Sequence, residues 1–244
     1  MGLYIEARIH AELDLLWDRT QDPAQHQRWD LRFTTIDYLP RAEGEPQHFR
    51  YATRVLPFLS VAGTGVSAGE TERPDGTRTS ALRFASPHPL SLLKEGGGYW
   101  RYVPEGDGVR FLTGYDYRPR WGRFGRVADR FLFRPLMVWA TAWSFDRLRL
   151  WLERGITPER ALWNWLAELA VRALVLTAAC VGIFQGPGHA ASLMFAIPPL
   201  LLVAACLALF ASPLPCVPAA RRCVRRAPAR ARAPRLTRTL ETPR

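Results

Sequence analysis

The feature that most constrains this chain is a run of twenty-one residues without a charge, Ala190–Phe210. As a helix that rises about 1.5 Å per residue, this run would be roughly 31 Å long, close to the thickness of the hydrocarbon core of a bilayer. It lacks the polar stripe of a soluble surface helix. Pro198 and Pro199 would break a helix in water, but lipid-embedded helices tolerate proline. The run therefore predicts a membrane-spanning helix.

A second apolar segment, residues 161–184, precedes this run and contains two charges, Glu168 and Arg172. The two charged residues are four apart with the acid first, which is the favourable order for an ion pair on a helix. Only the sequence QGPGH separates the two segments. We therefore expect a transmembrane hairpin over residues 161–211, with helices at about 161–184 and 190–210. The alternative for residues 161–184 is an amphipathic helix that lies on the membrane surface.

The positive charge of the chain is concentrated after this hairpin. The net charge is +11, and residues 213–244 hold nine arginines against a single glutamate. Arginines flank both ends of the hairpin, whereas the QGPGH turn contains no Lys or Arg, so the positive-inside rule predicts a cell-membrane protein with both flanks cytoplasmic. Residues 212–244 are expected to form a basic, disordered cytoplasmic tail near anionic lipid headgroups. No nucleic-acid partner is expected.

Residues 1–155 have the pattern of an α+β domain. Residues 3–10 alternate as a strand, residues 11–30 show helical spacing with a break near Pro23, and about six strand-like runs follow, divided by turns such as RPDGT and PEGDG. From residue 122 to 154 the helical period returns, with a kink expected at Pro135 and an end at Gly155. The expected buried stripe of this long helix consists of Phe124, Val127, Phe131, Val138, Ala142, Phe145 and Leu152.

The opening sequence IEARIHAELDLLWDRTQDPAQHQRWD, with Trp17, Asp22-Pro23 and Trp29, resembles the start of the START-like, or SRPBCC, superfamily. That superfamily includes polyketide cyclases and lipid-transfer domains. The order of elements is also similar, so the resemblance covers about residues 1–155. It implies a helix-grip fold, in which a curved antiparallel sheet is closed by a long C-terminal helix, with a deep apolar cavity between them. It brings no universal catalytic motif.

Aromatic side chains are the expected lining of such a cavity. Strand alternation places many of the aromatic residues in GGYWRYV and GVRFLTGYDYR on shared faces, a pattern that fits either a pocket for an apolar ligand or an ordinary packed core. Arg83, Arg101 and Asp116 either turn inward as a buried pair or remain solvated cross-strand charges. The candidate ligand-binding residues are Phe84, Trp100, Tyr102, Phe111, Tyr115, Tyr117, Phe131, Trp139, Phe145, Arg83 and Arg101.

The sequence indicates no catalytic or metal-binding constellation and no cofactor. The five histidines lack the spacing of metal ligands, so each is expected to be a lone surface or capping residue. The glycine-rich runs EGGGY and AGTGVSAG lack a phosphate-loop lysine and a dinucleotide fingerprint, and they are typical of bent strands or hairpin ends.

Three functions are compatible with these features. The leading hypothesis is a membrane-anchored, cytoplasm-facing domain that binds a hydrophobic small molecule or lipid in an apolar cavity. The first alternative is an aromatase/cyclase-type enzyme acting on a polyketide-like substrate, which would require a buried polar group with a shifted pKa. The second alternative is a non-enzymatic adaptor whose helical hairpin docks a membrane partner. Whether the chain is an enzyme is left open.

Overall fold

The computed structural model describes residues 2–56, 59–185 and 197–227. The chain divides into two compact units. The first unit contains the residues up to Pro158 together with those from Ala219 onward, and the second contains Glu159–Pro218. Residues 186–189 of the QGPGH turn, the first part of the second apolar run (residues 190–196) and the tail beyond residue 227 lie outside the described residues.

The first unit is built on an antiparallel sheet, which the described residues form in the order β1-β7-β6-β5-β4-β3-β2. Two helices, α1 (Leu13–Gln21) and α2 (Pro23–Trp29), follow the first strand. The strands are β1 (Leu3–Ile9), β2 (Thr35–Tyr38), β3 (His48–Leu56), β4 (Leu59–Glu72), β5 (Arg78–Ala85), β6 (Leu93–Glu105) and β7 (Gly108–Pro119). The predicted α+β order of one strand, two helices and six further strands is therefore confirmed.

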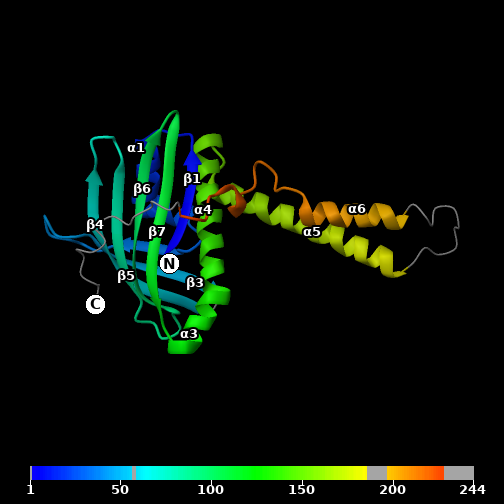
Figure 1. The fold of residues 1–244 in the computed structure, drawn as a ribbon, viewed down its shortest axis with the longest axis horizontal. Helices are drawn as coiled ribbons and strands as arrows, with labels where there is room; N and C mark the ends of the chain where they lie inside the picture. Colours follow the sequence, from blue (N-terminus) through cyan, green and yellow to red (C-terminus); the bar gives the residue numbers. More distant parts are fainter. Residues whose placement is uncertain (1, 57–58, 186–196, 228–244) are drawn as a thin grey trace. The chain divides into compact units, whose positions relative to one another are not determined.

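A long helix, α4 (Arg134–Arg154), runs along one face of this sheet (Figure 1). The buried middle of α4 packs against apolar side chains of β1 and β7, and Phe145 stacks on Phe111 with ring centroids 4.4 Å apart. Gly155 ends the helix in the left-handed region at φ 65°, where a residue without Cβ is favoured. The expected end of the long helix is thus confirmed.

The start of the long helix differs from the expectation. It consists of three successive pieces, α3 (Gly122–Ala128), the π-helix η1 (Asp129–Phe133) and α4, and Pro135 sits in the first turn of α4. Three residues of the expected stripe are exposed, Phe124 at 71%, Val127 at 57% and Phe131 at 73%. A π-helix places more residues in each turn, so a 3.6-residue stripe that starts in α3 does not continue across η1 onto the buried side of α4.

Part of the segment predicted to be a disordered tail packs onto the first unit. Val224 and Glu6 of β1 exchange two backbone hydrogen bonds, both 2.9 Å from N to O. The buried Asp146 carboxylate of α4 accepts hydrogen bonds from the Ala219 backbone N (2.7 Å) and from Arg222 Nη1 (2.8 Å). Because β1 is an edge strand, this segment covers backbone groups that would otherwise be open to pairing with another chain.

The second unit contains two apolar helices, α5 (Pro158–Gln185) and α6 (Ile197–Phe210), which lie side by side (Figure 1). Gly182 allows their close approach, because a Cβ there would lie 2.6 Å from Leu201 Cδ1. Within the described residues, one helix, Pro158–Gly182, is long and apolar enough to cross a membrane. The described part of α6 has 14 residues, about 21 Å of helix, which is shorter than a bilayer core. Two spans are therefore not shown.

Candidate functional site

The side of the sheet that faces α4 carries the largest cluster of candidate residues. The register pairs Tyr102 with Phe111 and Trp100 with Thr113, so these side chains share one face, as alternation predicts. Phe111 contacts Trp100 (5.9 Å between ring centroids), Tyr102 (4.9 Å) and Phe145. The Tyr115 hydroxyl lies 3.2 Å from Thr141 Oγ1 on α4. Five predicted residues are thus brought together, and around Phe111 their rings fill the space in which a cavity was expected.

Phe84 and Tyr117 lie on the same face, farther along the strands. Phe84 pairs with Gly96, and Gly96 pairs with Tyr117, so all three residues share the register of the inner face. Both rings are partly exposed, unlike those around Phe111. The Tyr117 hydroxyl donates a hydrogen bond to Asp129 of η1, and burial together with this bond raises the pKa of Tyr117 well above its ordinary value.

Four candidate residues lie elsewhere. Phe131 is exposed in η1. Trp139 stacks on Trp143. Successive residues of a helix are about 100° apart, so Trp139 lies about 200° around α4 from Thr141, which faces the sheet. Arg83 and Arg101 occupy strand positions on the sheet face that is turned away from α4, and Arg101 lies over the Tyr99 ring. Asp116 is in register with Gly97 and Arg83 on that same face, so none of the three charged residues turns inward.

A buried ion pair does occur in the interior, between residues that the sequence did not single out. Arg32 donates to both oxygens of Asp30, from Nε at 2.9 Å and from Nη2 at 2.6 Å. His26 Nε2 lies 3.0 Å from Asp30 Oδ2. The side chains of Asp30, Arg32 and His26 are 0%, 10% and 12% exposed. This group, the Asp30 cluster, places a cation within an otherwise aromatic interior.

The local sequence explains how the Asp30 cluster forms. Asp22 caps α2 by accepting a hydrogen bond from the Ala24 N, and Pro23 fixes the first turn. Residues 26 and 30 are four apart on and just after this short helix, so their side chains meet. The Arg32 guanidinium lies 5.6 Å from the Tyr115 ring centroid, which is within cation–π range. In the sequence, the signal for this contact is the His-x-x-x-Asp spacing at the end of a helix, because His26 by itself indicates no partner.

Burial and charge determine the protonation states of the Asp30 cluster. Burial acts to raise the pKa of Asp30, but the Arg32 guanidinium outweighs burial and holds that pKa well below its usual range. Burial lowers the pKa of His26, against the opposing effect of Asp30. Near neutral pH, Asp30 is therefore ionised and His26 is neutral. The ring of His26 lies among Trp29, Phe33 and Trp100, which accommodate a neutral imidazole.

The lowered pKa of His26 predicts a pH-dependent stability. The unfolded chain binds a proton at His26 near pH 6.5, whereas the folded chain does so only at lower pH, so stability is lost as the pH falls below about 6.5. For one proton, the free energy of unfolding changes by at most about 1.4 kcal/mol per pH unit. The stabilisation that comes from the lowered pKa of Asp30 is lost only at lower pH, because this loss begins near the pKa of a carboxyl group in the unfolded chain, about 4.

Thermal unfolding of the full chain in mild detergent, followed by tryptophan fluorescence between pH 5 and 7.5, measures this slope. His26→Gln, which retains a donor toward Asp30, should flatten it, and His48→Gln at an exposed position serves as the control. An unchanged slope in His26→Gln would show that other groups control stability in this range.

The interior is more open at the end where Phe84 and Tyr117 lie. Phe33 and Tyr51 contact each other there at 5.7 Å between ring centroids, and all four aromatic side chains are partly exposed. Burial raises the pKa of Tyr51 to about 12, so its hydroxyl stays protonated at neutral pH. These four rings form what we call the open end of the interior, and the Arg32 guanidinium lies 5.4 Å from the Phe33 ring centroid. The open end presents apolar surface with one buried cation, a composition suited to an apolar ligand that carries a polar group.

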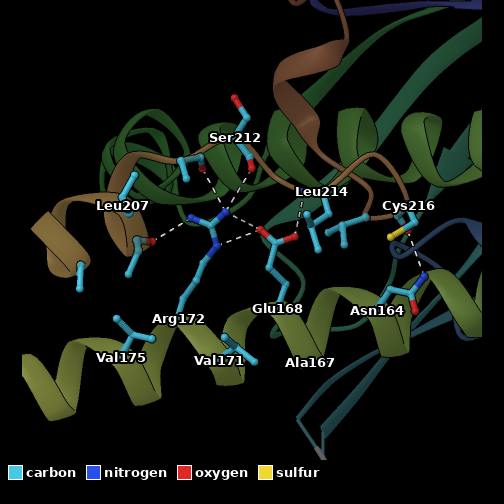
Figure 2. Close-up of a pocket in the computed structure, with 14 residues that line it drawn as sticks. Asn164, Ala167, Glu168, Val171, Arg172, Val175, Leu207, Ser212, Leu214 and Cys216 are labelled. Atoms are coloured by element: carbon cyan, nitrogen blue, oxygen red, sulfur yellow. Dashed lines mark hydrogen bonds and ion pairs between the residues drawn. The ribbon is translucent and has the colours of Figure 1, made fainter.

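Two hollows of the described structure lie outside this interior. One, of about 970 Å³, is on the sheet face turned away from α4, around Tyr99, Gly97 and Gly114. The other, of about 630 Å³, lies within the second unit between α5 and α6 (Figure 2). Its lining is apolar except for a few groups, chief among them Glu168 and Arg172.

The expected ion pair between Glu168 and Arg172 is present and does more than neutralise two charges. Arg172 Nη2 lies 2.5 Å from Glu168 Oε1, and the same guanidinium donates to the carbonyl oxygens of Ala208 (2.8 Å) and Ala211 (3.0 Å) at the end of α6 (Figure 2). Glu168 Oε2 accepts from the Leu214 N at 3.0 Å. The pair therefore caps the C-terminal carbonyls of α6, where a cation is favoured, and joins the two apolar helices.

Comparison with known proteins gives one close relative in sequence and several likenesses in fold. No protein-family model matches the chain. Over 159 residues, or 65% of its length, the chain is 48% identical to the uncharacterized membrane protein YndG of Bacillus subtilis (strain 168). The aligned region spans 59% of that relative, so less than two thirds of it is represented.

Solved structures with a similar fold include the protein TTHA0849 from Thermus thermophilus (TM-score 0.46, 19% identity, 62% of this chain and 97% of that one). A STAR-related lipid transfer protein from Xanthomonas axonopodis has a TM-score of 0.46 and 19% identity, over 61% of this chain and 84% of that one. The human StAR-related lipid transfer protein 5 has a TM-score of 0.44 and 15% identity, over 62% of this chain and 74% of that one. These likenesses concern the fold alone. The antiparallel sheet and the long helix against one of its faces, described above, have the arrangement that the resemblance implied for residues 1–155.

Proposed function

We propose that this chain is a membrane-anchored domain that binds an apolar molecule with a polar group at the open end of its START-like interior. The supporting observation is a difference in burial between two parts of one interior. Around Phe111 the rings are buried against one another, whereas Phe33, Tyr51, Phe84 and Tyr117 keep part of their surface exposed. Aromatic surface left uncovered beside a buried cation is suited to a ligand.

Apolar burial would provide most of the affinity. Each methylene removed from water contributes about 0.8 kcal/mol, so a ligand with a short hydrocarbon body needs few polar contacts. Arg32 would orient the ligand. Asp30 takes two of the five N–H donors of the guanidinium, which leaves donors for Tyr115 and for a carbonyl or carboxylate oxygen of the ligand.

The anchor in this proposal is a hairpin formed by α5 and the apolar run that ends in α6, with both flanks on the cytoplasmic side. The length and composition of Pro158–Gly182 support one span, and the charge-free run from residue 190 supports the second. The Arg172–Glu168 cap gives these two charges within the apolar part of α5 internal partners, as charges within an apolar hairpin require. The similarity to a bacterial membrane protein supports attachment to a membrane.

Filling the open end tests the ligand site. Leu82 on β5 is partly exposed on the inner face, in register with Gly98, whereas its neighbour Arg83 is on the opposite face. Leu82→Trp should occupy ligand volume, and Arg83→Trp adds the same ring on the other side of the sheet. Native mass spectrometry of the full chain, released from mild detergent, should show a small-molecule adduct on wild type and on Arg83→Trp that is reduced at least about tenfold on Leu82→Trp.

Adducts that are equal in all three proteins would come from lipid around the hydrophobic helices, and the proposed site would be wrong. A protein partner in stoichiometric amount, without a small-molecule adduct on wild type, would favour the adaptor function instead.

A further inference from the structure

The segment that joins the sheet to α4 exposes large apolar side chains in a regular row. Phe124, Val127 and Phe131 follow one another at spacings of three and four residues along α3 and η1, and each is more than half exposed. Leu132 and Leu136 are also more than half exposed, and Trp121 is 42% exposed. Contiguous apolar surface of this kind on a folded domain marks an interaction site.

A row of arginines runs beside the apolar row. Arg123, Arg126 and Arg130 each precede one member of the apolar row by one residue, and all three are exposed. Among the residues that the structure describes, none of these three forms an ion pair with a carboxylate, and Arg130 lies over the Phe131 ring at 5.6 Å. The one acid of the segment, Asp129, is engaged by Tyr117 and lies 3.9 Å from Arg134. The surface is therefore both apolar and positively charged.

Local packing fixes these two rows in the observed orientation. Gly125 is buried in α3, and a Cβ at that position would lie 1.6 Å from the Arg120 carbonyl oxygen, so this side of α3 faces inward. Arg120 itself donates to the Ser91 and Ser86 carbonyl oxygens, and Trp121 Nε1 donates to the Pro89 carbonyl oxygen at 3.0 Å. Figure 1 shows α3 at one end of the first unit, at the bottom of the view.

We propose that this α3–η1 surface, made of the apolar row Phe124, Val127 and Phe131 and the basic row Arg123, Arg126 and Arg130, binds the surface of a bilayer that contains anionic lipid. Parallel apolar and arginine rows are the pattern of helices that lie in the interfacial plane, with the rings among the acyl chains and the cations at the phosphates. The contact is separate from both the helical hairpin and the basic tail, and it does not depend on ligand binding.

A second copy of the chain fits this surface less well. In a two-fold symmetric dimer the same patch meets itself, so the arginine rows would approach each other while the one acid of the segment, Asp129, is engaged by Tyr117. Anionic headgroups provide the negative charge, and the hydrocarbon beneath them covers the rings. Three arginines near an anionic surface together account for about a hundredfold in membrane affinity.

Photo-crosslinking from a single position distinguishes these occupants in the full chain. Phe131→p-benzoylphenylalanine keeps an aromatic ring at an exposed site, and Tyr38→p-benzoylphenylalanine on β2 is a matched control, because Tyr38 is 47% exposed outside this surface. Each protein is reconstituted into nanodiscs of phosphatidylcholine alone or with about one third phosphatidylglycerol, irradiated and analysed by mass spectrometry. We expect lipid adducts at position 131 with phosphatidylglycerol present, at least about tenfold above those at position 38.

Removing the charge tests the basic row. Arg123→Gln, Arg126→Gln and Arg130→Gln combined with the position-131 probe should lower the lipid adduct at least about tenfold, whereas Arg73→Gln at an exposed site on the same unit should not. A covalent dimer as the main product at position 131 would overturn the proposal in favour of self-association. Lipid adducts equal at positions 131 and 38, or unchanged by the triple substitution or by omission of phosphatidylglycerol, would also overturn it.

Discussion

Replacing Asp146 with alanine should detach the segment that follows the helical hairpin from the first unit. The Asp146 side chain is 0% exposed, and its carboxylate accepts hydrogen bonds from Arg149 Nε at 2.7 Å, from Arg222 and from the Ala219 backbone. Without it, the two cations and the amide lose their shared acceptor. Removing one partner of a buried ion pair costs about 3–5 kcal/mol, and this loss falls on the contact between α4 and residues 219–224.

Limited proteolysis with trypsin measures this release at defined bonds. Cleavage after Arg222 and Arg225 should be slow in the wild-type chain, because Cys223 is buried and Val224 is bonded to Glu6, and it should become at least about tenfold faster in Asp146→Ala. Asp107→Ala is the control, since Asp107 pairs with Arg8 but is 76% exposed. Equal cleavage rates at both bonds in Asp146→Ala and wild type would mean that apolar contacts alone hold the segment.

Burial raises the pKa of the Cys223 thiol to about 12, which gives a second measure of the same release. A thiol at that pKa is almost entirely protonated near neutral pH and reacts slowly with alkylating reagents. Detachment in Asp146→Ala exposes the thiol and returns its pKa toward the ordinary value. The alkylation rate of Cys223, followed by peptide mass spectrometry, should therefore rise together with cleavage after Arg222.

Patterns with a short period were the most informative part of the sequence. Alternation in β6 and β7 correctly put Trp100 and Tyr102 on one face and Phe111, Tyr115 and Tyr117 on one face, because the two-residue period of a strand survives any curvature of the sheet. The i, i+4 spacing of Glu168 and Arg172 likewise predicted their ion pair. The same spacing gave no information about the capping of α6, which depends on a chain reversal between residues 172 and 208.

Other features could not be obtained from local patterns. The π-helix at Asp129–Phe133 changes the period inside what reads as one helix, so the exposure of Phe131 was predicted wrongly. The return of residues 219–224 to β1 joins residues more than two hundred positions apart, and an arginine-rich composition masks it. The buried pair of Asp30 and Arg32 is also not predicted, because local spacing does not show whether a charged side chain is buried.

That buried pair provides the prediction with the largest expected effect in the interior between the sheet and α4. Arg32→Met should destabilise the first unit by about 3–5 kcal/mol, because Asp30 is left ionised and buried with only His26 and the backbone as partners. Asp30→Ala should cost a similar amount, since it strands the guanidinium beneath the Tyr115 ring. Arg73→Met, at an exposed position, should change stability by less than about 0.5 kcal/mol.

The double variant Asp30→Ala, Arg32→Met separates the two roles of this pair. If the pair serves the fold, removing both charges should recover most of the single-variant loss, because an apolar replacement of a buried ion pair is often neutral. Denaturant unfolding of the full chain in mild detergent measures all four corners of the cycle, and the coupling energy should be at least about 2 kcal/mol. Strictly additive losses would mean that the two side chains act separately. If Arg32 also orients a ligand, the double variant should regain stability yet lose the small-molecule adduct, because the four aromatic side chains of the open end cannot replace the charge of the guanidinium.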